Sequence, residues 1–353
     1  MSPLYKIYSG QKILITGHTG FKGSWLVQWL HHLGAEVSGI ALDPITDPNL
    51  FDAAELKELC RDYRVDLCDY ATVQKVVLEV QPDIIFHLAA QPLVRESYRL
   101  SRETFNINVM GSVHVFEAAR SCTSVQVLVH VGTDKVYENE EWDYGYREND
   151  PLGGHDPYSA SKAAAEIAFQ SYLRSFFYPV GSIRAASGRA GNVIGGGDWA
   201  KDRIVPDAMK AVQSGKPIEV RNPASTRPWQ HVLEALSGYV TLGGLLLQKD
   251  DRALGSWNFG PNAESIHSVK DLVEAVLPVW GSGSWVHTGD PDAPHEAGAL
   301  TLCIDKARQR LGWAPKWDFR ETIKRTVQWY RGFYDGKSPR ELCKEDIAAY
   351  MRS

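Results

Sequence analysis

The sequence predicts an α/β protein built on a doubly wound parallel sheet, with a smaller lobe in its C-terminal half. Short apolar runs alternate with longer amphipathic segments through the first half of the 353-residue chain. This β-α-β-α order is typical of a parallel sheet with helices on both faces. The first apolar run ends in a glycine-rich turn that opens a helix, and after about residue 190 glycines and prolines interrupt shorter elements.

The elements of the sheet are predicted from the spacing of apolar residues. Strands are expected at 12–16, 36–42, 83–88 and 126–131, with a short one just before Asp66. Helices are expected at 23–33, 71–80 and 102–120, and the last helix of the chain at 320–333. Because ligands of such sheets bind beyond the carboxyl ends of the strands, functional side chains are expected directly after strands.

Composition and charge exclude several classes of function. A formal net charge of -5 and a pI near 6.1 argue against a nucleic-acid partner, which usually requires a basic face. No stretch reaches the ~20 apolar residues of a membrane helix, and residues 1–12 lack the apolar core of a signal peptide. The five scattered cysteines show no zinc-ligand spacing, so we expect no metal site and interpret them as reduced thiols of a cytoplasmic protein.

A glycine-rich turn follows the first strand. Gly17 can form the tight turn, Gly20 lets the backbone approach a pyrophosphate, and Gly23 lets helix and strand pack closely. A diphosphate would lie at the helix N-terminus, where free N–H groups and the helix dipole favour an anion. The turn is not a P-loop, because its lysine precedes the last glycine. The predicted cofactor contacts of this turn are Gly17, Thr19, Gly20, Phe21, Lys22 and Gly23.

The ends of the next strands complete a dinucleotide site. Asp43 closes the second strand, where a carboxylate accepts hydrogen bonds from an adenosine ribose and repels the 2'-phosphate of NADP, so NAD is the predicted cofactor. Asp66 and Leu67 are predicted to hold the adenine, with a plain turn as the alternative. Backbone against the dinucleotide is also expected after the next strand, although packing alone would explain its alanines; these residues are Leu88, Ala89 and Ala90.

Two lobes follow from this arrangement. Residues 1–191 are predicted to form a Rossmann domain that binds NAD, and the chain is expected to return to it near 228–261. Residues 192–227 and 262–353 are predicted to form a smaller lobe that covers the strand ends and binds the substrate.

Tyr158 and Lys162 stand four residues apart, on one face of a predicted helix. A phenol with a pKa near ~10 is a poor base at neutral pH. Lowering this pKa by ~3 units requires about 4 kcal/mol of differential stabilisation. A lysine ammonium and an oxidised nicotinamide ring could supply it, so we expect both residues to contact the cofactor and to take part in catalysis.

Several motifs carry a family resemblance. The glycine turn, residues 87–90 and the Tyr158–Lys162 spacing resemble the extended short-chain dehydrogenase/reductase family. Thr133 and Asp134 stand where sugar-nucleotide dehydratases of that family carry a threonine and an aspartate. Longer stretches, which span nearly the whole chain, are similar to the CDP-glucose 4,6-dehydratase group: 17–26, 141–148, 153–162, 191–202 and 227–234.

This resemblance implies an NAD-dependent lyase that converts CDP-glucose to a 4-keto-6-deoxy sugar nucleotide and water. A hydride would leave C4 of the sugar and return to C6 after water is lost. Tyr158 would remove the 4-hydroxyl proton, Thr133 would hydrogen-bond the 4-oxygen, and Asp134 would be the general acid for the departing 6-hydroxyl. Lys162 would hold the nicotinamide ribose.

Lys135 departs from the broader dehydratase pattern, in which a glutamate at this position is the base for C5. A lysine base must be neutral, so burial or nearby cations must lower its pKa from ~10.4. Alternatively, Lys135 stabilises the enolate as a cation and another group or water takes the proton. The lysine agrees with the CDP-glucose group.

The resemblance also implies substrate contacts in the second half. Asn192 and Arg227 are expected to bind the diphosphate, since a guanidinium pairs bidentately with phosphate oxygens. His231 is expected to be structural. The predicted substrate contacts are Gln91, Asn192, Asp198, Trp199, Arg203, Arg227 and His295.

Other functions share part of this pattern. A nucleotide-sugar 4-epimerase would use Tyr158 and Lys162 but has no need of Asp134 and Lys135. A dTDP-glucose or GDP-mannose dehydratase is disfavoured by Lys135, and an NAD-sensing regulator would be expected to lose Tyr158 or Lys162. Relatives pair through two long helices of the first lobe, so a homodimer or homotetramer is expected.

Overall fold

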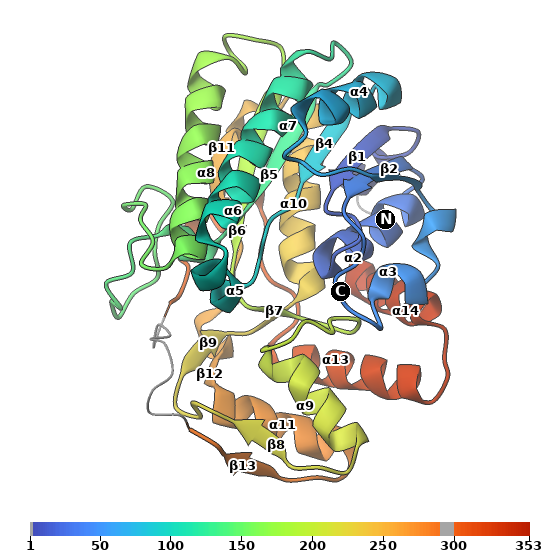
Figure 1. Ribbon diagram of the computed structural model, residues 1–353, viewed down its shortest axis with the longest axis vertical. Coiled ribbons are helices and arrows are strands. Elements are labelled where there is room, and N and C mark those ends of the chain that lie inside the picture. Colours follow the sequence, from blue (N-terminus) through green and yellow to red (C-terminus); the bar gives the residue numbers. More distant parts are fainter. Residues whose placement is uncertain (1–2, 290–299) are drawn as a thin grey trace.

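Figure 1 shows the chain as a computed structural model, which describes residues 3–289 and 300–353. A sheet with helices on both faces forms the upper part of the view, and a smaller group of helices and short strands lies below it. The seven strands of the sheet follow the order β11-β6-β5-β4-β1-β2-β3, and every pairing is parallel. The predicted doubly wound parallel α/β fold is confirmed. The strands are β1 (Lys12–Thr16), β2 (Glu36–Ala41), β3 (Arg61–Arg64), β4 (Ile84–His87), β5 (Val127–Thr133), β6 (Arg184–Ala190) and β11 (Gly255–Asn258).

Two buried clusters sandwich the sheet. Ile13 of β1 belongs to one cluster and Leu14 to the other, because successive side chains of a strand point to opposite faces. Phe116 and Phe169 cover the face of Leu14, and Leu233 covers the face of Ile13. The helices packed on the sheet are α2 (Phe21–His32), α4 (Tyr70–Val80), α7 (Gly111–Arg120), α8 (Pro157–Ser175) and α10 (Val232–Leu247).

Shorter helices complete this part of the molecule. The helix predicted at 102–120 is interrupted by a π-helical turn at Asn106–Met110, between α6 (Ser101–Phe105) and α7. The other short helices are α1 (Pro3–Lys6), α3 (Leu50–Ala53), α5 (Val94–Arg99) and α12 (Asp305–Leu311). None of the helices in the described part of the chain combines the length and apolarity that crossing a bilayer requires.

The lower group of elements comes from separate stretches of the chain, because α10, β11 and α12 return to the sheet between them (Figure 1). Its helices are α9 (Ile204–Gln213), α11 (Val269–Trp280) and α13 (Phe319–Tyr334). The short strands pair as β8 (Ile218–Val220) with β13 (Trp285–His287) and β9 (Thr226–Pro228) with β12 (Ile266–Ser268). A third pair joins β7 (Val193–Ile194) to β10 (Gln230–His231). Between these stretches, α10 and β11 bring the chain back to the sheet, since β11 pairs with β6.

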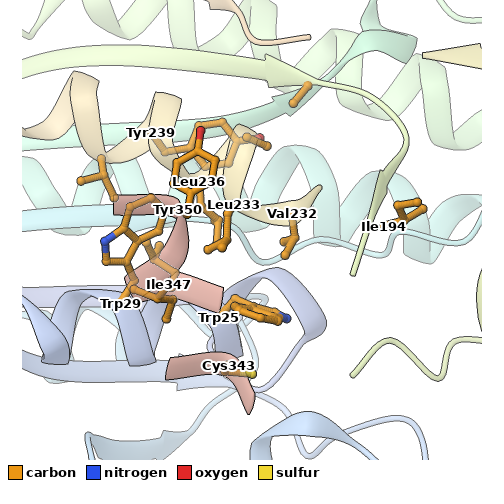
Figure 2. Packing of buried hydrophobic residues seen from close by; sticks show 14 of the residues in the cluster. Trp25, Trp29, Ile194, Val232, Leu233, Leu236, Tyr239, Cys343, Ile347 and Tyr350 are labelled. Carbon is orange, nitrogen blue, oxygen red and sulfur yellow. The ribbon is translucent and has the colours of Figure 1, made fainter. Parts of the chain in front are cut away.

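The prediction of the last helix was wrong. The segment at 320–333 is α13, but a further helix, α14 (Pro339–Arg352), follows it. Pro339 occupies the first turn of α14, a helix-start signal that the apolar spacing does not show. Figure 2 shows that Ile347 and Tyr350 pack beside Trp29 of α2, and the Trp29 and Tyr350 ring centroids are 5.7 Å apart. The end of the chain thus lies against the sheet half, and the proposed lobe boundaries remain a prediction.

Candidate active site

The end of β5 and the start of α8 bring predicted catalytic side chains together. The hydroxyl of Thr133 donates to the carboxylate of Asp134 at 2.9 Å, and both side chains lie close enough to Tyr158 to act on the pKa of its phenol. Asp134 is 3% exposed, and a Cβ on Gly191 would come within 1.9 Å of its carboxylate oxygen. Lys135 is partly exposed, and its backbone N–H donates to the Thr133 hydroxyl at 3.4 Å. Threonine, aspartate and phenol therefore meet at the carboxyl end of the sheet.

Helix α8 positions Tyr158 and Lys162. Its N-terminus is capped by Asp156, whose carboxylate accepts a hydrogen bond from the backbone N–H of Ser159 at 2.9 Å. The Lys162 side chain is buried, and its ammonium donates to the carbonyl oxygen of Val131 at 3.0 Å. The four-residue spacing places the lysine one helical turn behind the phenol.

Burial dominates the protonation of these two groups. It raises the pKa of the Tyr158 phenol to about 12, against a lowering by the neighbouring Thr133 side chain. Burial lowers the pKa of the Lys162 ammonium to about 8, against a raising by the Glu166 carboxylate. The protein alone therefore keeps Tyr158 a neutral phenol at pH 7, and a base at this position requires a further positive charge beside it.

Lys22 belongs to the same group of charges. It is the second residue of α2, in the turn predicted to bind the cofactor. Burial and the Arg203 guanidinium lower the pKa of Lys22 to about 8, and the Asp134 carboxylate raises it. Arg203 itself pairs with Asp198 at 2.8 Å, and its charge also acts on Tyr158. The lysine of the glycine turn thus shares an electrostatic environment with the catalytic candidates.

The glycine turn has the geometry of a cradle for an extended ligand. Gly17 has a φ of 77°, and a Cβ there would lie 2.8 Å from the backbone of Ala89. A Cβ on Gly23 would lie 2.1 Å from the carbonyl oxygen of Gly17. No side chain caps α2 at Gly20, so the helix N-terminus is open to an anion. Half-buried residues after β4 line the neighbouring strand end: Leu88, Ala89 and Ala90.

Charged side chains gather at the ends of β2 and β3. The Asp43 side chain is 88% exposed and lies 3.5 Å from Arg64. Arg64 also pairs with Asp62 at 2.8 Å, and Asp62 in turn contacts a ring nitrogen of His18 at 2.8 Å. Thr19 donates to the carbonyl oxygen of Leu42, the residue before Asp43. Sequence reasoning identified Asp43 but missed Arg64, Asp62 and His18, because the pairing of these side chains depends on the register of β3 beside β2.

The remaining cofactor-side candidates have local partners. The Asp66 carboxylate accepts a hydrogen bond from the backbone N–H of Cys68 at 2.9 Å, as in a turn. Leu67 is 5% exposed and packs in the core. The Gln91 side-chain amide donates to the Thr104 hydroxyl at 2.9 Å, so it is used within its own loop.

Two substrate candidates are polar residues on the chain between the lobes. Asn192 directly follows Gly191, with a left-handed φ of 23°, and thus lies next to Asp134. Arg227 is partly exposed in β9, and its guanidinium donates to the carbonyl oxygen of Thr226 at 2.8 Å. His295 lies outside the described residues.

Trp199 and His231 are packing residues in this structure. Trp199 was predicted to contact substrate, but it is 4% exposed and lies 5.8 Å from Trp329 between ring centroids. His231 is buried between the rings of Trp25 and Trp317, at 5.7 and 4.9 Å, as expected for a structural residue.

Comparisons with known proteins show the family to which the chain belongs. The model of the GDP-mannose 4,6-dehydratase family matches residues 14–326. The chain belongs to this family. The CDP-glucose 4,6-dehydratase of Salmonella typhimurium is 43% identical over 349 residues, which are 98% of this chain and 97% of the relative. The dTDP-glucose 4,6-dehydratase of Neisseria gonorrhoeae is 29% identical and covers 94% of this chain and 98% of its own.

Solved structures of related proteins share the fold of this member of the GDP-mannose 4,6-dehydratase family. The UDP-glucose 4-epimerase of Thermus thermophilus, in complex with NAD, has a TM-score of 0.77 at 26% identity, over 91% of this chain and 99% of its own. The dTDP-glucose 4,6-dehydratase of Streptomyces venezuelae, with NAD bound, has a TM-score of 0.77 at 22% identity, over 93% and 99%. Epimerases and dehydratases therefore share this architecture.

Proposed function

We propose that this chain is an NAD-dependent CDP-glucose 4,6-dehydratase. The observation that carries the proposal is the grouping of Thr133, Asp134 and Tyr158 at one strand end, beside Lys135. The 43% identity to a CDP-glucose 4,6-dehydratase over 98% of the chain supports the choice of sugar nucleotide. The resemblance to dTDP-glucose dehydratases is weaker, at 29% for the Neisseria gonorrhoeae relative.

The residues of the glycine turn fit a dinucleotide. A Cβ at Gly17 or Gly23 would clash with the backbone of the strand ends and of the turn itself, so only glycine fits there. The N-terminus of α2 is open to a diphosphate. Asp43 is free of burial and suits an adenosine ribose. When bound, NAD supplies reversible hydride acceptance, so that the sugar is oxidised at C4 and later reduced at C6. Its oxidised ring also carries the positive charge that Tyr158 needs beside it.

The side chains of the chain divide the proton transfers between them. Tyr158, with Lys162 behind it, takes the proton of the sugar 4-hydroxyl as C4 is oxidised. Thr133 donates a hydrogen bond toward the 4-oxygen. Asp134 gives a proton to the 6-hydroxyl, which leaves as water.

Lys135 assists the removal of the proton at C5. It occupies the position of the C5 base and is partly exposed, so it can return its proton to solvent. As a neutral amine it takes the proton directly; as a cation it stabilises the enolate while water accepts the proton. A Lys135→Met variant in deuterated water distinguishes the two alternatives. If water is the base, the C5 proton still exchanges for deuterium in this variant. If the amine is the base, this exchange is lost.

The proposal is tested by offering CDP-, dTDP- and UDP-glucose and GDP-mannose to the purified protein with NAD. We expect a 4-keto-6-deoxy product, detected by its absorbance in alkali, with CDP-glucose as the preferred substrate. A clear preference for dTDP-glucose would contradict the choice of nucleotide. Interconversion of 4-epimers without loss of water would show that the protein is an epimerase.

We further propose a homodimer or homotetramer in the cytoplasm. Exposed apolar side chains occur on the neighbouring elements α6, the π-helical turn and α8, which lie side by side in Figure 1. These side chains are Phe105, Met110 and Ile167. All five cysteines are free, which suits a reducing compartment.

A further inference from the structure

A buried carboxylate lies behind the catalytic lysine. Glu166 follows Lys162 by four residues on α8, as Lys162 follows Tyr158, so the three side chains share one helix face. Glu166 forms an ion pair with Arg189 of β6 at 2.7 Å, and both side chains are fully buried. Sequence reasoning identified Tyr158 and Lys162 but not this third member of the series.

The hydrogen bonds of Glu166 are concentrated on one oxygen. Its Oε1 accepts from the Ser187 hydroxyl at 2.6 Å, the Ser256 hydroxyl at 2.7 Å and the Arg189 guanidinium. Oε2 has no hydrogen-bond partner among the described residues, and a Cβ on Gly132 would lie 3.4 Å from it. The second oxygen therefore points toward the strand end that carries the catalytic threonine.

Arg189 extends this network to the edge of the sheet. Its Nη1 donates to the Tyr137 hydroxyl at 2.7 Å, and that hydroxyl donates to the Asn258 side chain at 2.7 Å. The amide of Asn258 donates to the carbonyl oxygen of Tyr146 at 2.8 Å. The ion pair thus ties α8 to β6, to β11 and to the loop that follows η3 (Asp134–Val136).

Titratable groups from several elements surround Lys162, and Glu166 is the carboxylate that acts on it. Burial holds the pKa of His87 on β4 and of His130 on β5 well below the usual value, so both imidazoles are neutral. Lys22 on α2 and Arg189 on β6 are cations, and Asp134 acts on Lys22. The carboxylate raises the pKa of Lys162 against the effect of burial.

A purely stabilising ion pair is a poor explanation for this arrangement. Desolvating two charges generally offsets their attraction, and an apolar pair of similar volume is often as stable. Burial alone would raise the pKa of Glu166, but Arg189 and the hydroxyls of Ser187 and Ser256 lower it below its usual value. The network therefore keeps one buried carboxylate ionised, one helical turn from the lysine.

We propose that Glu166 is a positioning residue for the proposed dehydratase reaction, whose buried carboxylate keeps Lys162 charged behind Tyr158. The inference rests on the proposed function only through the step that Lys162 assists. Its expected signature is electrostatic, because removal of the carboxylate changes the pH at which Lys162 loses its proton.

Glu166→Gln tests this inference. Because the carboxylate raises the pKa of Lys162, its removal lowers that pKa, so the alkaline limb of the kcat profile moves to lower pH by about one unit or more. Ser256→Ala is the matched control, since it removes one hydrogen bond to Glu166 and keeps the charge. We expect the control to keep the limb of the unmodified enzyme. An unmoved limb in folded Glu166→Gln overturns the inference.

A second variant tests the inference if Glu166→Gln alone does not fold. Glu166→Gln combined with Arg189→Met removes both members of the buried pair, an exchange that proteins often tolerate. The limb should still move to lower pH, by less than in the single variant, because the Arg189 cation is also gone. NADH binding, followed by fluorescence from pH 6 to 10, reports on Lys162 whatever sugar nucleotide the enzyme accepts. A shifted binding profile without turnover of CDP-glucose would contradict the proposed function alone, and an unshifted profile would contradict the inference.

Discussion

Tyr158 lies in the first turn of α8, one helical turn ahead of Lys162. Its burial raises the pKa of the phenol to about 12, so the protein without cofactor does not hold a phenolate. The spacing of Tyr158 and Lys162 predicted their proximity, but the direction of the pKa shift depends on desolvation, which no sequence pattern reports. The charge of oxidised NAD is thus an integral part of the proposed base.

Tyr158→Phe is expected to lower kcat by about 10²- to 10⁴-fold, the usual contribution of a positioned acid or base. The phenyl ring keeps the packing, so NADH binding measured by fluorescence should change little. The thermal unfolding midpoint serves as the control for folding. Turnover equal to that of the unmodified enzyme would remove Tyr158 from the mechanism.

Lys22 was predicted as a cofactor contact, and its surroundings give it a second possible partner in Asp134. If its ammonium meets the NAD diphosphate, Lys22→Met removes a charge-assisted hydrogen bond of about 1.5–3 kcal/mol, or roughly ten- to hundredfold in NAD affinity. Lys22→Arg should keep most of that affinity. Titration with NADH measures both variants. Unchanged affinity together with a reduced kcat would place the function of Lys22 at Asp134 instead.

At the scale of the elements, the parallel sheet was predictable and the end of the chain was not. The strands that precede Gly17 and Asp43, and the strand that ends at Thr133, are buried runs, so their positions along the chain follow from local pattern to within two residues. Helix α14 has a weaker pattern, and its place beside α2 depends on Trp29 and Tyr350, which are far apart in sequence. The Glu166–Arg189 pair was missed for the same reason.

A buried carboxylate also joins α10 to α14. Glu234 accepts hydrogen bonds from the backbone N–H of Trp317 at 2.7 Å and from the hydroxyl of Tyr350 at 2.5 Å. Burial raises the pKa of Glu234 to about 7. Because the folded-state pKa lies above that of the unfolded chain, the protonated carboxyl stabilises the fold at low pH. That stability is lost as the pH rises from about 4.5 to about 7.

Glu234→Gln should therefore become less destabilising as the pH rises. A glutamine cannot ionise, so it escapes the loss that the glutamate suffers, on the order of 1–3 kcal/mol between pH 5 and pH 8. Urea unfolding at both pH values measures the difference in free energy of unfolding between the two proteins. Tyr350→Phe is the control, since it removes a hydrogen bond at the same site and leaves the titratable group. A difference between Glu234→Gln and the unmodified protein that stays constant with pH would contradict this assignment.

At the scale of the whole molecule, the fold brings the predicted cofactor site and the predicted catalytic residues to the same edge of the sheet. The sheet offers its glycine turn at the end of β1 and its catalytic residues at the end of β5, while α9 and β9 come from the lower group of elements in Figure 1. Arg203 and Asn192 lie where the chain passes from one group to the other. An NAD-bound epimerase shares this fold, so the proposed dehydration depends on side chains, above all on the proposed functions of Asp134 and Lys135.

The proposed dimer is a prediction at this scale. Ile167 is 56% exposed on α8, next to the exposed apolar residues of α6 and the π-helical turn. A charge at the centre of an apolar interface is strongly unfavourable unless it is paired, so Ile167→Glu is expected to yield monomers in light scattering coupled to gel filtration. Val180→Glu is the matched control, because Val180 is 68% exposed in the turn after α8 and should leave the assembly unchanged. An Ile167→Glu protein that keeps the mass of the unmodified assembly would place the interface on another face. Because α8 also carries Tyr158 and Lys162, a monomer with weakened NADH binding would further indicate that assembly stabilises the catalytic helix.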